Sequence, residues 1–242
     1  MNDTIRTARA TGAWYLGLAI TGMVGVLVID PLLFDETNPA ATLSHLQARP
    51  ELAHLRVALE LGLVLTQAMA ALWFGKLFRR ISPVAGAGVA LFGMVNATAL
   101  LIGSALLAVA VTVAGNPALA PGGDAAATAT LLHTLDSQIG VAAGVFFGLW
   151  LIPMGWVALT RGRFPRVLGW ALVAGGVGYV TGAFVHLGFA DAPSALVNGL
   201  PWLATVGEMW MLGYLLIKGI RPDTHPAVIA RLSPAANQGS FS

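Results

Sequence analysis

Two residues of opposite charge stand in the first turns of an otherwise apolar run, "ELAHLRVALELG" at residues 51–62. Arg56 and Glu60 are four residues apart, so on a helix they share one face and can form an ion pair. Ionisable groups in apolar segments are costly to bury and often belong to a binding site or an ion pathway. A structural salt bridge that only lowers the cost of both charges is the alternative.

A second group of ionisable residues is compatible with metal or ligand binding. His133 and Asp136 are three residues apart, and Asp30, Glu60 and His186 lie at a similar depth in other apolar runs. Imidazoles and carboxylates contributed by several helices are the usual ligands of zinc and related metals. The chain has no HExxH motif, nucleophile elbow or phosphate loop. A hydrogen-bonded structural cluster is therefore the simpler interpretation of the same residues.

The chain that positions these residues has the composition of a membrane protein. Of its 242 residues, 57% are hydrophobic and 10% are charged, and the mean hydropathy is +0.77. Soluble domains carry about 25% charged residues. The chain has no cysteine, which excludes disulfides, thiolate metal ligands and cysteine nucleophiles. The sequence thus indicates an all-α integral membrane protein whose first partner is the lipid bilayer, and it indicates no cofactor.

Six apolar runs are long enough to cross about 30 Å of hydrocarbon at about 1.5 Å per residue. They cover approximately residues 12–33, 53–78, 84–113, 131–160, 166–189 and 199–219. The connections between them contain the proline, glycine and asparagine that mark loops. We therefore expect one six-helix transmembrane domain over residues 1–220, followed by a flexible cytoplasmic tail over residues 221–242.

Basic residues are distributed asymmetrically about these runs. Eleven of the thirteen flank the N-terminus, the short connections "RRISP" and "RGRFP", or the C-terminal end, and only Arg49 and Arg56 lie opposite. The positive-inside rule then places both termini in the cytoplasm. The pI near 9.4 reflects this topology and not a nucleic-acid partner. A cleaved signal peptide is the alternative for the first run, but its apolar length favours a retained helix.

The distance of each polar residue from the basic end of its helix predicts two polar layers. The outer layer contains Asp30, Arg56, Glu60, Asp136 and His186, with His133 just beyond it, and the layer near mid-bilayer contains Gln67, Asn96 and Glu208. No basic residue shares the depth of Glu208. We expect Gln67 and Asn96 to bond to each other, and Glu208 to pack against amide or backbone acceptors.

Stripes of small residues lead to two of the outer polar residues. At four-residue spacing they are Gly140, Gly144 and Gly148 for Asp136, and Ala174, Gly178 and Gly182 for His186. Small residues at this spacing allow close helix packing in lipid. We therefore expect Asp136 and His186 to point into the bundle and to meet Arg56 and Glu60 at its outer end.

Four segments resemble an uncharacterised bacterial family of six-helix membrane proteins, domain of unknown function 4386. They are "ARATGAWYLGLAITG", "FFGLWLIPMGW", "RFPRVLGWALVAGGVGY" and "GEMWMLGYLLIKG", in this order along nearly the whole chain. The resemblance implies a six-helix fold in the bacterial inner membrane. It implies no activity and no catalytic residue.

Three functional classes follow from the residues. The favoured hypothesis is a protein that binds or transports a small or lipid-like ligand through an outward-facing polar cluster. The alternatives are a non-catalytic accessory or assembly subunit, with a membrane-protein partner or a second copy of the chain, and an intramembrane metal-dependent enzyme. A wide cavity would favour the first class, fully paired side chains the second, and converging metal ligands the third.

Overall fold

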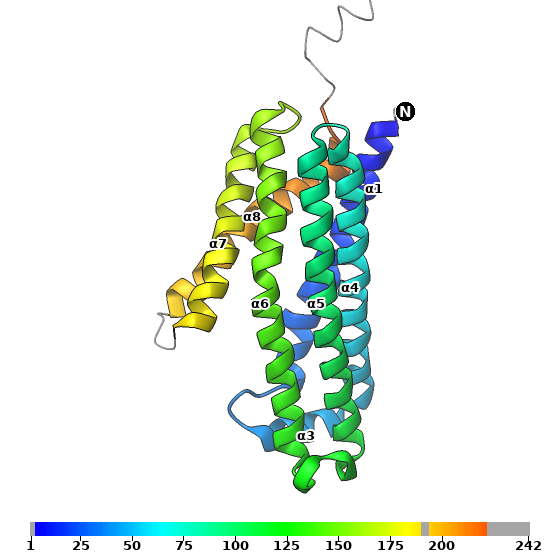
Figure 1. Ribbon diagram of the computed structural model, residues 1–242. Helices are drawn as coiled ribbons and strands as arrows, with labels where there is room; N and C mark the ends of the chain where they lie inside the picture. Colours follow the sequence, from blue (N-terminus) through cyan, green and yellow to red (C-terminus); the bar gives the residue numbers. More distant parts are fainter. Residues whose placement is uncertain (1–2, 190–193, 222–242) are drawn as a thin grey trace, which may run out of the picture.

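The computed structural model describes residues 3–189 and 194–221, and over these residues it contains helices and no strand (Figure 1). Within this described part, five helices are long and apolar enough to cross a membrane. They cover Asp3–Leu33, Pro50–Arg79, Pro83–Gly115, Ala125–Thr160 and Arg166–Gly188. The predicted all-α, membrane-type fold is therefore confirmed, whereas the predicted tail lies almost entirely outside the described residues.

The helices follow one another with short connections. The first span consists of α1 (Asp3–Met23), the π-helix η1 (Val24–Ile29) and α2 (Asp30–Leu33), and α3 (Pro39–Ala48) follows it. The remaining long helices are α4 (Pro50–Arg79), α5 (Pro83–Gly115), α6 (Ala125–Thr160), α7 (Arg166–Gly188) and α8 (Ser194–Ile217). Two short 3-10 helices, η2 (Pro117–Leu119) and η3 (Pro121–Gly123), connect α5 to α6.

The sixth predicted span, 199–219, coincides largely with α8. This helix has 24 residues, but its continuously described apolar part, Ala204–Ile217, is shorter than a full span. A sixth crossing therefore stays a prediction.

The sequence analysis missed α3, because residues 35–50 read as a loop. The helix has a clear start signal: the Asn38 side chain accepts a hydrogen bond from the Ala41 amide at 3.1 Å, and Pro39 occupies the first turn. Its buried residues Thr42 and Leu46 pack toward the bundle. In Figure 1, α3 lies across one end of the bundle, where it contacts α5 and α6.

The long helices form a chain of neighbouring pairs. α5 packs between α4 and α6, α7 packs on α6 and α8, and α1 packs on α4 and α8. In Figure 1, α7 begins beside α6 at the basic end and diverges from it toward the end that carries α3. The described ends of the chain lie together, since Gly219 approaches Ile5. The C-terminal end also contacts the connection between α6 and α7, where the Arg221 amide donates to the Arg163 carbonyl at 3.3 Å.

The two halves of the bundle are packed differently. Toward the basic end, Tyr15, Phe74 and Trp150 are fully or almost fully buried and contact one another edge to face, with ring centroids 5.4–5.7 Å apart. A second apolar cluster, which includes Leu33 and Leu107, closes the opposite end under α3. The polar residues of the sequence analysis lie between these two cores.

Glycines bring α6 and α7 into close contact at Gly148, which belongs to the predicted stripe, and at Gly155, which does not. A Cβ atom at Gly148 would collide with the Gly176 carbonyl oxygen, and one at Gly155 would lie 2.7 Å from the Gly169 carbonyl oxygen. By contrast, a Cβ atom at Gly140 would meet no atom within 4 Å, and one at Gly144 would meet only the Tyr179 ring, at 3.7 Å. Gly140 and Gly144 therefore leave space beside α6 and do not serve as tight packing positions.

This difference gives a prediction within one helix. Gly148→Ala should destabilise the protein by about 1–3 kcal/mol, because the methyl group must displace backbone of α7. Gly140→Ala is the matched control and should leave stability unchanged or slightly raised. Thermal unfolding in detergent, followed by tryptophan fluorescence, measures both. Equal destabilisation by the two changes would contradict this account of α6–α7 packing.

Candidate functional site

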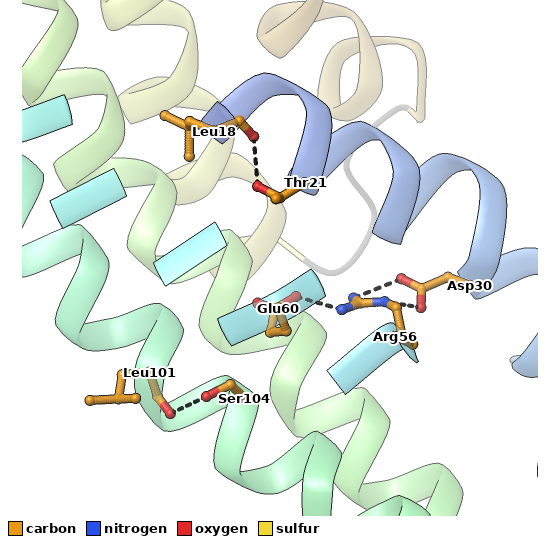
Figure 2. A network of polar contacts seen from close by, with 7 residues as sticks. All are labelled: Leu18, Thr21, Asp30, Arg56, Glu60, Leu101 and Ser104. Atoms are coloured by element: carbon orange, nitrogen blue, oxygen red, sulfur yellow. Dashed lines mark hydrogen bonds and ion pairs between the residues drawn. The ribbon is translucent and has the colours of Figure 1, made fainter. Parts of the chain in front are cut away.

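A buried arginine joins the first span to α4. The Arg56 Nε and Nη2 atoms donate to Asp30 Oδ1 and Oδ2 at 2.6 and 3.0 Å, and Nη1 donates to Glu60 Oε2 at 2.6 Å. Figure 2 shows the guanidinium between the two carboxylates. The side chain of Arg56 is 4% exposed, that of Glu60 6% and that of Asp30 17%. The i,i+4 pair expected from the sequence is thus part of a three-residue network that reaches another helix.

The π-helix explains how Asp30 reaches Arg56. Pro31 has no amide hydrogen, and its ring would clash with the carbonyl four residues earlier in a regular α-helix, so the wider π-turns of η1 precede it. Gly25 in η1 lies beside the guanidinium, where an added Cβ atom would be in ordinary van der Waals contact, 3.5 Å from Arg56 Nε. Asp30 therefore not only lies near the end of the first span but also joins it to α4 through Arg56.

The other outer residues surround this network without bonding to it. Asp136 is buried, and its Oδ1 atom lies against Gly103 of α5, where a Cβ atom would collide with it. The His133 ring stacks on Phe34, with centroids 3.7 Å apart, and its buried Nδ1 atom has no hydrogen-bond partner among the described residues. His186 is exposed, yet it lines the same cavity as Arg56 and Glu60.

These residues line one large cavity, of about 920 Å³. Its polar wall includes every member of the predicted outer layer: Asp30, Arg56, Glu60, His133, Asp136 and His186. Its apolar wall includes Val26, Leu27 and Phe34 from the first span and its connection, Leu100 from α5 and Ala183 from α7. Gly140 and Gly144 line it as well, which accounts for the space that they leave beside α6.

A second cavity of about 300 Å³ lies at the depth of the predicted inner layer, and we call it the inner chamber. Glu208, Gln67 and Asn96 line it together with Tyr15 and Tyr179. The Tyr15 hydroxyl donates to Glu208 Oε1 at 2.8 Å. Glu208 is 7% exposed and Tyr15 2%.

The predicted partners of the inner polar residues are wrong. Gln67 and Asn96 do not bond to each other: their side-chain amides donate to the carbonyl oxygens of Gly93, at 3.4 Å, and Ala143, at 2.9 Å. Glu208 accepts from a tyrosine and not from these amides. Gln67 faces Gly93 of α5, and Asn96 faces Ala143 of α6. Because glycine and alanine have small or no side chains, each amide reaches the backbone carbonyl of the neighbouring helix.

Sequence reasoning missed the aromatic residues of the site. Tyr15 and Tyr179 line cavities, and Phe34 supports His133. Buried tyrosine hydroxyls usually find a hydrogen-bond partner, so the tyrosines within apolar runs carried a usable signal. Within the described ranges, no three histidine or acidic side chains are grouped so that they could hold a metal ion.

The Arg56 network gives a second prediction. Arg56→Met should destabilise the protein by about 3–5 kcal/mol, because two carboxylates would remain in a site without a counter-ion. The triple change Arg56→Met, Asp30→Asn and Glu60→Gln should recover much of this loss, since no unpaired charge remains. Thermal unfolding in detergent compares the three proteins. If Arg56→Met alone were as stable as the original protein, the network would not hold the first span to α4.

Comparison with known proteins supports the resemblance noted in the sequence. A family model with the description Domain of unknown function (DUF4386) matches residues 10–219, which include both cavities and all the candidate residues. Neither the curated proteins nor the solved structures provide a match. The chain therefore belongs to the family of domain of unknown function 4386.

Proposed function

We propose that this protein binds a small or lipid-like ligand in the outer cavity, as a carrier or a receptor in the bacterial inner membrane. The observation that supports this function is the cavity itself, about 920 Å³ between helices of a membrane-type bundle. Ligand pockets typically have volumes of about 300–1,000 Å³ and combine apolar walls with a few placed polar groups. The outer cavity has both features.

The proposal includes the topology expected from the sequence. Six helices cross the membrane and both termini are cytoplasmic, which makes the end that carries α3 and the cavity face outward. The spacing of the apolar runs and the grouping of basic residues at one end support this arrangement.

The other functional classes have less support. Arg56 is fully engaged by two carboxylates, which suits a structural network, but pairing does not account for a large cavity beside it. A metal-dependent enzyme would need converging ligands, and the described side chains offer no such group. An accessory subunit or a homo-oligomer would be consistent with the short connections, but no cavity is needed for that role.

Filling the cavity tests the proposed function. Gly140 lines the cavity, and a side chain added there would point into open space, so Gly140→Phe should block ligand binding while the protein still folds. Native mass spectrometry of gently purified protein should detect a retained lipid or metabolite in the original chain and its loss in the variant. Gly213→Phe is the matched control, because Gly213 also has free space but lines neither cavity. If no species is retained, or if both variants retain it equally, the proposed function is wrong.

The topology can be tested with single cysteines, since the chain has none. Arg80 lies in the exposed α4–α5 connection and Ala118 is exposed in η2 at the other end of α5. In intact cells, an impermeant maleimide should label Ala118→Cys and leave Arg80→Cys unlabelled, and both should react after lysis. Labelling of Arg80→Cys in intact cells would refute the cytoplasmic termini.

A further inference from the structure

The inner chamber adjoins the outer cavity, because Leu63, Leu100, Gly140, Gly144 and Tyr179 line both spaces. A single ligand that occupied both spaces would contact these shared residues. The volume of about 300 Å³ corresponds to roughly ten water molecules at about 30 Å³ each, enough for a compact head group.

The polar groups of the inner chamber are arranged to accept hydrogen bonds. The Tyr15 hydroxyl donates to Glu208, and the Gln67 amide already donates to the Gly93 carbonyl. Gln67 has no exposed surface, so its Oε1 atom, which accepts no hydrogen bond from any described residue, is not reached from the chamber. Glu208 is 7% exposed and accepts from Tyr15 through Oε1, which leaves its Oε2 atom for a ligand.

The electrostatic character of the inner chamber favours a cation. Glu208 is its only acidic residue, and no arginine, lysine or histidine is among its described lining residues. The Tyr15, Phe147 and Tyr179 rings also line it, and Phe147 contacts Tyr179 edge to face at 4.9 Å. Aromatic faces attract organic cations, and this attraction is strongest where water is excluded.

The remaining wall distinguishes an organic cation from a metal ion. Leu18, Met23, Leu63, Leu100 and Met209 supply apolar surface around the polar groups. Calcium is usually bound by several carboxylate oxygens, whereas Glu208 is the one carboxylate among the described residues of this wall. Methylene or methyl groups attached to a charged nitrogen would instead pack against it.

We propose that the inner chamber binds the positively charged nitrogen of an organic ammonium compound, whose apolar remainder occupies the outer cavity. This assignment rests on the proposed function and names the chemical class of its ligand. Glu208 balances the charge, and the rings of Tyr15, Phe147 and Tyr179 surround the charged nitrogen. The ammonium group can belong to a free amine or to a lipid head group.

The test uses the full chain in a non-ionic detergent and compares matched probes by isothermal titration calorimetry. Benzyltrimethylammonium should bind to the original protein, and neopentylbenzene, in which a carbon atom replaces the nitrogen, should bind at least about tenfold more weakly. Lysophosphatidylcholine serves as a second arm, because it carries the same cationic group on a lipid. Tighter binding of the lipid would show that the ammonium group comes from a lipid head group. Tighter binding of the free cation would show that it comes from a soluble amine.

Variants locate the cation. Glu208→Gln keeps an acceptor for Tyr15 and should weaken cation binding at least about tenfold. Glu51→Gln is the matched control, because it removes an exposed carboxylate that lines neither cavity, and it should change the affinity less than about threefold. Tyr15→Phe should retain or strengthen binding, since it frees Glu208 from its donor.

Several results would overturn the assignment. Equal affinity for the cation and its uncharged isostere would show that the charge is not recognised, and this comparison needs no variant to fold. Loss of binding in Asp136→Asn but not in Glu208→Gln would place the cation in the outer cavity. Displacement by an equal concentration of sodium chloride would identify an inorganic cation site. In each case the Gly140→Phe result still decides the proposed function independently.

Discussion

One buried guanidinium determines how the outer half of this protein is arranged. Arg56 lies between carboxylates from two different helices, and none of the three charges could remain in an apolar environment without the other two. The network fixes the rotation of the first span relative to α4, and the π-turns of η1 precede the Asp30 that it engages. The cavity exists beside this network because the first span and α4 are held together here while α7 diverges from α6 (Figure 1).

The protein thus combines a solid half with a hollow half. Near the basic end, aromatic rings and paired glycines fill the space between helices, and the hydrogen bond from Tyr15 to Glu208 lies within this packing. Toward the other end, glycines of α6 face open space and carboxylates and imidazoles line it. A rigid base and an open, polar end are what a membrane protein needs to hold a ligand without losing its fold.

Apolar run length and charge asymmetry were sufficient to predict an all-α membrane fold, because the thickness of hydrocarbon sets helix length directly. Counting from the helix ends also predicted which polar residues share a depth, and Asp30, Arg56 and Asp136 do line one cavity. Side-chain partners were harder to predict. Depth does not determine which atoms bond to each other: His186 lines the cavity without joining the Arg56 network, and Gln67 and Asn96 bond to backbone carbonyls of neighbouring helices. The π-turns and Tyr15 were missed because neither alters the hydrophobic pattern.

The π-helix makes the number of residues in the first span part of the site. Each residue added to or removed from a helix turns everything beyond it by about 100°. If Val24–Ile29 kept its six residues but wound as a regular α-helix, Asp30 would be turned by about 100° from its direction toward Arg56. Loss of one residue together with regular winding would nearly restore that direction, because the wider π-turns accommodate one extra residue. Length and winding of this segment are therefore coupled, and homologous chains should have either six residues in π-turns or five in a regular helix.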